Sequence, residues 1–238
     1  MNLYEQTLEK QLDSWKKDIL KKESMIKKTT NKVQNKTQNL LPDKVQSTIT
    51  STIEGMTKLI MNGSGFLTVK ENTEGLSLAE SEYLVLTQFS KYQKAAMSEG
   101  FSFGLGGIIL GVADLPALLS IKIKFMFDAC KLYGFDPNLI EERLFILYIF
   151  QLSYSSKDNK QEIFKIINNW NKTDIKNFDW EKFQLEYRNY LDIAKMLQLV
   201  PVIGSVVGAT ANYKLMNTLK KNLMNCYRLR IMNDNKMI

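Results

Sequence analysis

Histidine is absent from the 238-residue chain, and this absence excludes several classes of enzyme. Ser-His-Asp and Cys-His sites need an imidazole base, H-E-x-x-H zinc sites need histidine ligands, and carboxylate-bridged di-iron bundles need Glu-x-x-His motifs. The two cysteines, Cys130 and Cys226, are far apart in sequence and form no C-x-x-C motif, so they do not supply a structural zinc site. The sequence predicts neither a metal site nor a cofactor.

A secretory signal is also missing, because the first residues show no basic segment followed by an apolar one. Both cysteines lie in apolar helical patterns and are expected to be buried, reduced thiols, which is typical of a cytoplasmic protein. Prolines number only four, and few turn-forming clusters interrupt the long periodic segments. We expect an all-α fold: a single compact multi-helix domain with glycine-rich central helices and an N-terminal helical arm.

Long hydrophobic runs are scarce. Residues 100–113 are uncharged, but about 14 residues fall short of the roughly 20 that a membrane-spanning helix needs. Residues 196–213 are also uncharged, but Gln198, Pro201, Ser205, Thr210 and Asn212 dilute their hydrophobicity. Segments of this kind are more often buried core helices, with re-entrant or interfacial helices as the alternative.

Positive charge is concentrated at the two ends of the chain. The net charge is +7; residues 1–50 hold ten lysines against six acidic residues, and residues 201–238 hold six basic residues against one acidic residue. Basic ends suit an anionic membrane surface, where each basic group is worth about 1 kcal/mol. They are equally typical of solvated helices. A nucleic-acid partner is not expected, because no recognition motif accompanies the charge.

Helical spacing of apolar residues covers most of the chain. The first helix is expected within 3–20, where Tyr4, Leu8, Leu12, Trp15 and Ile19 form one stripe. We assign residues 1–40 to a basic amphipathic arm and residues 41–238 to one helical domain. The stretch 155–178 is rich in lysine and asparagine and predicts an excursion or a short helix.

Several helix ends carry local signals. Ser77 and Glu80 form a capping box, and Gly134 fits the left-handed residue that ends a helix. Asp114 followed by Pro116, and Asp136 followed by Pro137, both predict helix starts. Further helices are expected to begin at Pro42 and Pro201 and to occupy residues 180–198.

Two groups of small residues are the most unusual feature. Gly100, Gly104, Gly107 and Gly111 share one helical face, and Gly204 and Gly208 form a second small-residue face. Glycine inside a helix costs roughly 1 kcal/mol relative to alanine, so a close approach of some partner must offset it. The partner is either a neighbouring helix of the same protein or a lipid chain. A phosphate loop is excluded, because Ile109 and Val112 occupy positions that need glycine and lysine.

Two segments resemble signatures of the EcsC family. They are Gly104-Leu-Gly-Gly-Ile-Ile-Leu-Gly-Val-Ala-Asp114-Leu-Pro-Ala-Leu118 and Val200-Pro-Val-Ile-Gly204-Ser-Val-Val-Gly208-Ala-Thr-Ala-Asn212. The resemblance implies a mainly helical bacterial protein with no established enzymatic activity. The family's namesake is encoded beside an ABC transporter, which implies work at the membrane and an integral membrane transporter as partner.

The resulting hypothesis is a non-enzymatic accessory protein, peripheral on the inner face of the membrane, that binds lipid or a membrane protein. The predicted binding residues are Gly100, Gly104, Gly107, Gly111, Asp114, Pro116, Pro201, Gly204, Gly208 and Asn212. One alternative is a carboxylate-dependent hydrolase of lipid or envelope precursors, for which Asp114 and Glu142 are the catalytic candidates. The other is a purely protein-interacting helical scaffold. The oligomeric state does not follow from the sequence.

Overall fold

A computed structural model describes residues 3–21, 43–63, 69, 73–103, 115–172 and 205–234. These residues form seven α-helices and one 3-10 helix, with no β-strand among them, so the predicted all-α class is confirmed. The elements are α1 (Leu3–Leu20), α3 (Asp43–Asn62), α4 (Leu78–Phe103), α6 (Leu115–Leu132), α7 (Ile140–Tyr154), α8 (Lys157–Asn168), η1 (Trp170–Lys172) and α11 (Ser205–Asp234).

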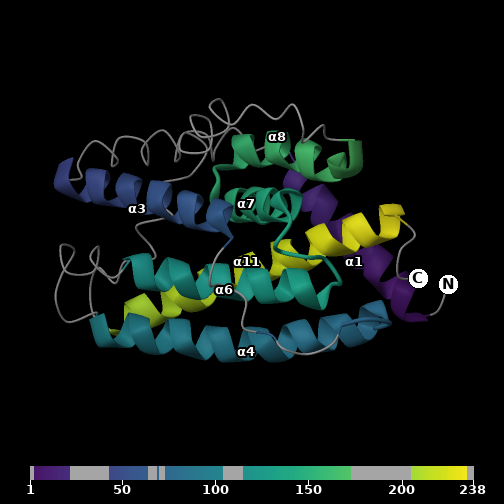
Figure 1. Cartoon of the computed structure of the whole chain (residues 1–238), viewed down its shortest axis with the longest axis horizontal. Helices are drawn as coiled ribbons and strands as arrows, with labels where there is room; N and C mark the ends of the chain where they lie inside the picture. Colours follow the sequence, from purple (N-terminus) through teal and green to yellow (C-terminus); the bar gives the residue numbers. More distant parts are fainter. Residues whose placement is uncertain are drawn as a thin grey trace.

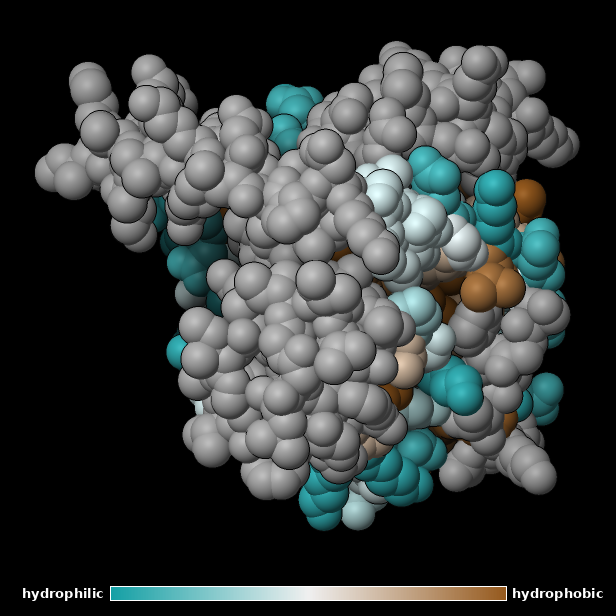
Figure 2. Space-filling model, turned by 90° about the vertical axis from the view of Figure 1, so that its left-hand side faces the viewer, coloured by the Kyte–Doolittle hydropathy of each residue, from teal (hydrophilic) through white to brown (hydrophobic). Residues whose placement is uncertain are grey.

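Helix α4 runs along one side of the bundle and packs against both α6 and α11 (Figure 1). It is antiparallel to α11, because Glu82 near the start of α4 bonds Arg228 near the end of α11, and Lys220 lies over the Phe89 ring. Figure 1 shows that α4 ends, and α6 and α11 begin, at its left-hand side. Figure 2 shows the molecule from that end. Where described residues are visible there, hydrophobic residues lie at the surface between hydrophilic ones.

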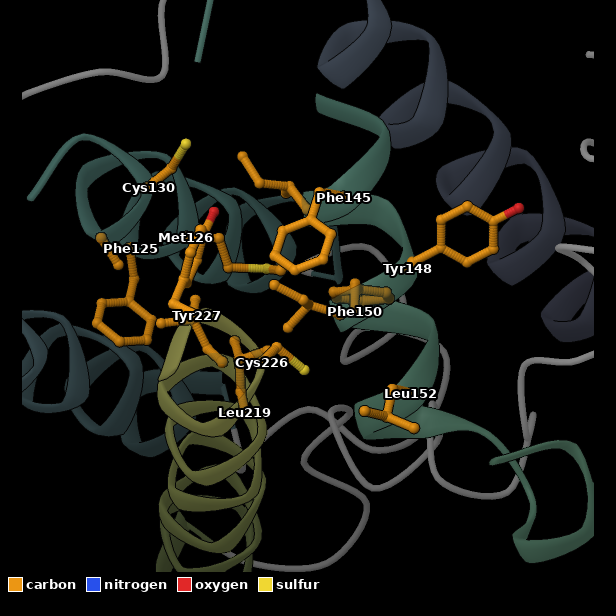
Figure 3. Packing of buried hydrophobic residues seen from close by; sticks show 14 of the residues in the cluster. Phe125, Met126, Cys130, Phe145, Tyr148, Phe150, Leu152, Leu219, Cys226 and Tyr227 are labelled. Atoms are coloured by element: carbon orange, nitrogen blue, oxygen red, sulfur yellow. The ribbon is translucent and has the colours of Figure 1, made fainter. Parts of the chain in front are cut away.

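Helix α7 occupies the centre. Every residue from Leu144 to Tyr154 is buried, because α7 contacts α3, α6, α8 and α11. Side chains from α6, α7 and α11 converge beside it, among them Met126, Phe150 and Cys226 (Figure 3). Tyr227 stacks on Tyr133 with ring centroids 4.9 Å apart. Both cysteines are buried and free, as predicted from the sequence.

Two of the predicted local end signals are confirmed. The Ser77 Oγ accepts from the Glu80 amide at 3.3 Å, and the Ser77 amide donates to Glu80 Oε2 at 2.8 Å, which is the complete capping box. Gly134 has φ +80°, and the Phe135 amide donates to the Cys130 carbonyl, the long-range bond of a Schellman motif.

The predicted helix start at Asp136 is wrong by about one turn. Helix α7 begins at Ile140, and the Asp136 carboxylate instead accepts from the Asn138 amide at 2.9 Å. An aspartate that bonds the backbone two residues on forms an Asx-turn, which competes with the helix for the same residues.

Helix α1 packs against α8 and α11 through its predicted stripe. Leu8, Leu12, Trp15 and Ile19 are all buried. The Trp15 ring meets Phe164 edge-on at 5.5 Å, and its Nε1 donates to Asn222 Oδ1 at 2.9 Å. The proposed domain boundary at residue 40 lies outside the described residues.

Replacing Trp15 with phenylalanine tests the contribution of α1. Phenylalanine keeps much of the ring packing but leaves the buried Asn222 carbonyl without its donor, so we expect a loss of about 1 to 2 kcal/mol in the free energy of unfolding. Urea denaturation measures it. A Trp15→Phe variant as stable as the parent would show that the hydrogen bond between Trp15 and Asn222 adds little to the stability of the bundle.

The asparagine-rich stretch contains a short helix, one of the two outcomes expected. Helix α8 buries Ile163, Phe164 and Ile167, and Trp170 follows in η1 with its ring 5.0 Å from that of Phe145. The helix predicted over 180–198 lies outside the described residues.

Candidate functional site

The predicted binding residues fall partly within the described structure. Gly100 lies in the last turn of α4, Pro116 in the first turn of α6, and Gly208 and Asn212 near the start of α11. The others lie outside the described residues: Gly104, Gly107, Gly111, Asp114, Pro201 and Gly204. Because α4 ends where α6 and α11 begin (Figure 1), the four described positions are brought to one end of the bundle.

The catalytic candidate Glu142 is held in an ion pair. Both of its carboxylate oxygens accept from Arg230, each at 2.6 Å, and the two side chains are almost completely buried. The Arg230 guanidinium also lies 4.1 Å from the centroid of the Phe135 ring. Burial lowers the pKa of Arg230, but the hydrogen bonds and charge of Glu142, with smaller contributions from Tyr227 and Cys130, raise it above its ordinary value, so the guanidinium stays charged. The geometry gives Glu142 a structural role.

A second buried pair joins α4 and α11. Arg228 Nη2 donates to Glu82 Oε2 at 2.7 Å, and the Tyr4 hydroxyl donates to the same oxygen at 2.8 Å. The sequence places Arg228 and Arg230 in a basic C-terminal end, but both are neutralised inside the bundle. Less C-terminal positive charge is therefore free at the surface than the composition indicates.

An apolar groove of about 210 Å³ lies between α3 and α6. Pro116, one of the predicted binding residues, is part of its wall. The full lining is Thr52, Gly55, Met56, Leu59, Pro116, Leu119, Ser120 and Ile123. A Cβ atom added to Gly55 would meet nothing within 4 Å, and the Leu59 side chain is 50% exposed. The groove therefore has an open wall and no ionisable side chain in its lining.

Lys122 is an unusual core residue that the sequence analysis missed. It lies on α6 with 0% of its surface exposed, and its Nζ has no hydrogen-bond partner in the described part of the chain. Burial lowers its pKa to about 7. The sequence does contain a signal for the burial of Lys122. Its neighbours are Ile121 and Ile123, and Leu118 and Met126 lie one turn away, so Lys122 lies within an apolar helical face.

No group of three or more histidine, cysteine, aspartate or glutamate side chains is placed to hold a metal ion within the described ranges. None of the helices in those ranges combines the length and the apolar character that crossing a bilayer requires.

Together, these features describe an all-α protein whose unusual chemistry lies in an apolar groove and in polar groups buried within a helical core. The chain belongs to the EcsC protein family, whose model matches residues 6–232. It is 40% identical to "Protein EcsC" of Bacillus subtilis (strain 168) over 220 residues, which cover 92% of this chain and 93% of the relative.

A second protein of the same organism is also similar. "Uncharacterized protein YdbA" of Bacillus subtilis (strain 168) is 32% identical over 142 residues, covering 57% of this chain and 52% of the relative. No solved structure matches the chain.

Proposed function

We propose that this EcsC-family protein is a non-enzymatic accessory protein that associates with the membrane by accepting one lipid acyl chain in the α3–α6 groove. The observation that carries the proposal is the groove itself, because it is open to the surface and lined mainly by apolar side chains. At about 210 Å³ it is smaller than the 300–1,000 Å³ typical of sites for compact ligands, so a single chain fits it better than a bulky molecule.

Charge beside the groove supports a lipid as the occupant. Lys58 adjoins Leu59 on α3 and is exposed, and Lys124 lies one turn after Ser120 on α6. Among the described residues beside these positions, Glu54, next to Gly55, carries the opposing charge, so two positive charges stand against one there and favour an anionic leaflet. The integral membrane transporter that the resemblance implies as a partner stays a prediction.

The test changes one residue of the groove wall. Because a Cβ atom added at Gly55 meets nothing within 4 Å, we expect Gly55→Phe to be accommodated with its ring in the groove. Burying acyl chain is worth about 0.8 kcal/mol per methylene, so losing two methylenes weakens membrane partitioning by roughly tenfold. We expect the parent protein to co-float with phosphatidylcholine–phosphatidylglycerol vesicles and Gly55→Phe to do so at least tenfold more weakly.

Two variants serve as controls for this test. Gly55→Ala adds one methyl group, leaves most of the groove open, and should keep vesicle binding while raising stability by up to about 1 kcal/mol. Ser90→Phe places an equal ring on the exposed face of α4 and should not weaken binding. Flotation that is equal in all four proteins, or absent in the parent, contradicts the proposal.

A further inference from the structure

A polar pocket lies where the end of α8 and η1 meet the last turns of α11. This α8–α11 pocket has a volume of about 380 Å³. It lies at the end of the bundle opposite to the one where α6 and α11 begin, and it shares no lining residue with the α3–α6 groove (Figure 1). Its polar side chains are Asn168, Asn169, Asn171, Lys172, Arg230 and Asn233.

Nearly consecutive residues supply the first wall of the pocket. Helix α8 ends at Asn168, and the Lys172 amide donates to the Asn169 carbonyl at 2.9 Å, which closes the 3-10 turn η1. Trp170 lies inside this turn and is buried, with its ring centroid 5.0 Å from that of Phe145. The buried indole therefore fixes the turn on the core while the polar side chains around it stay exposed.

Helix α11 supplies the opposite wall. Arg230 and Asn233 are three residues apart and so lie on one helical face. Glu142 holds the Arg230 guanidinium through two hydrogen bonds of 2.6 Å each. Both walls are thus anchored by buried contacts, and a site whose walls are already in place loses less conformational entropy when a ligand binds.

The charge of the pocket is close to a single positive unit. Its lining residues include no carboxylate, and Glu142 offsets the charge of Arg230. Lys172 therefore contributes the charge that remains. Helices α8 and α11 both end at the pocket, and the carbonyl groups at the C-terminus of a helix carry partial negative charge. This arrangement accommodates one negative charge on a ligand better than two or more.

The hydrogen-bonding groups of the pocket match a ligand rich in hydroxyl groups. Each asparagine amide both donates and accepts, as a hydroxyl group does, and four asparagines line the pocket. The volume of about 380 Å³ lies near the lower end of the 300–1,000 Å³ typical of small-molecule sites. A single sugar ring with a few water molecules is of suitable size.

Two other classes of ligand match the α8–α11 pocket less well. A nucleotide needs an aromatic face for its base, but the Trp170 side chain is 6% exposed and its ring already contacts Phe145 and Tyr148. A lipid acyl chain needs apolar walls, and the apolar part of this lining is confined to Ile167 and Trp170.

We propose that the α8–α11 pocket binds a sugar acid, which is a polyhydroxylated ring that carries one carboxylate. The Lys172 ammonium pairs with the carboxylate, and the amides of Asn168 and Asn233 exchange hydrogen bonds with ring hydroxyl groups. This site goes beyond the proposed function and does not depend on it.

Glucuronate is the probe, measured by calorimetric titration of the full chain at pH 7. Glucose has the hydroxyl groups without the charge, and acetate has the charge without the hydroxyl groups. We expect glucuronate to bind about threefold or more tightly than glucose, because an ion pair with an exposed lysine adds a modest amount of affinity. Acetate should bind about tenfold or more weakly than glucuronate, because it leaves the amides without ligand hydroxyl groups.

Three variants complete the experiment, and each replaces an exposed side chain. Lys172→Met should lower glucuronate binding to the level of glucose and leave glucose binding unchanged. Asn233→Leu should weaken both sugars by about threefold or more. Lys165→Met is the control, because Lys165 pairs with Glu162 outside the lining and should affect neither sugar. Glucuronate binding that Lys172→Met and Asn233→Leu leave unchanged, or that acetate equals, overturns the inference.

The outcome also separates the α8–α11 pocket from the α3–α6 groove. Vesicle flotation that Gly55→Phe weakens, together with no glucuronate binding to the parent protein, retains the groove and overturns the sugar-acid site. Glucuronate binding that Lys172→Met weakens, in a protein that does not co-float with vesicles, retains the sugar-acid site and overturns the proposed function.

Discussion

Lys122→Met is expected to raise the free energy of unfolding at pH 7 by about 2 to 5 kcal/mol. The lysine is fully buried without a partner, and methionine has a similar length with no charge to desolvate. The pKa of Lys122 falls from its ordinary 10.5 to about 7 in the fold, and each pKa unit corresponds to about 1.4 kcal/mol. The lower end of this range of free energies applies if the protein relaxes around the lysine or water enters, because both reduce the cost of burying its charge.

The stability that Lys122→Met gains over the parent protein should decrease as the pH rises above 7. Because the folded pKa lies below the unfolded one, the unfolded chain binds more protons between pH 7 and 10.5, and the stability of the parent protein rises with pH across that window. The advantage of Lys122→Met should be full at pH 7 and below, and decline toward pH 10. Urea denaturation at several pH values measures it, with Lys124→Met on the more exposed face as control.

No neighbouring charge accounts for the lowered pKa of Lys122. The helices around α6 carry other ionisable side chains, among them Glu54, Lys58, Tyr92, Lys94, Tyr148, Tyr154 and Lys220. Within the described part of the chain, the cause of the shift is burial. A gain that is independent of pH, or a loss of stability in Lys122→Met, would contradict a neutral buried lysine.

Glu142→Gln is expected to lower the free energy of unfolding by about 3 to 5 kcal/mol. Glutamine keeps the size of the side chain but removes the charge that Arg230 pairs with, and the guanidinium then lies uncompensated against Phe135 and Phe145. Calorimetry or urea denaturation measures the loss. The exposed Lys165–Glu162 pair is the matched control, because Glu162→Gln should change stability by less than about 1 kcal/mol.

A double variant separates a structural role from a catalytic one. Glu142→Met combined with Arg230→Met removes both charges, and it should recover most of the stability that either single change loses. Stability unchanged in Glu142→Gln would mean that the buried pair is not formed in solution.

Local sequence signals predicted the helix ends well because they act within a few residues. The capping box at Ser77, the left-handed Gly134 and the stripe from Leu8 to Ile19 each depend on one turn of chain. Asp136 shows the limit, since an aspartate before proline serves an Asx-turn as readily as a helix start.

Features that depend on packing between distant helices were not readable from the sequence. Arg228 and Arg230 look like a basic end until α4 and α7 bring Glu82 and Glu142 against them. Lys122 has a local signal in the apolar residues around it, but its complete burial depends on the helices that pack against α6. Pro116 of the groove was among the predicted binding residues, but the residues of α3 were not. A groove forms only where two helices pack side by side, and the sequence does not show that α3 packs against α6. Gly55 inside a helix was the groove's one local signal.

The most direct measurement of the central claim is photo-crosslinking from the acyl chain. Anionic vesicles carrying a phospholipid with a diazirine in one acyl chain are irradiated with the bound protein, and the labelled peptides are identified by mass spectrometry. Binding of an acyl chain in the α3–α6 groove predicts labels in residues 52–59 of α3 and 116–123 of α6, and the loss of these labels in Gly55→Phe. Labels confined to α1, α8 or the outer face of α4, unchanged by Gly55→Phe, would contradict it.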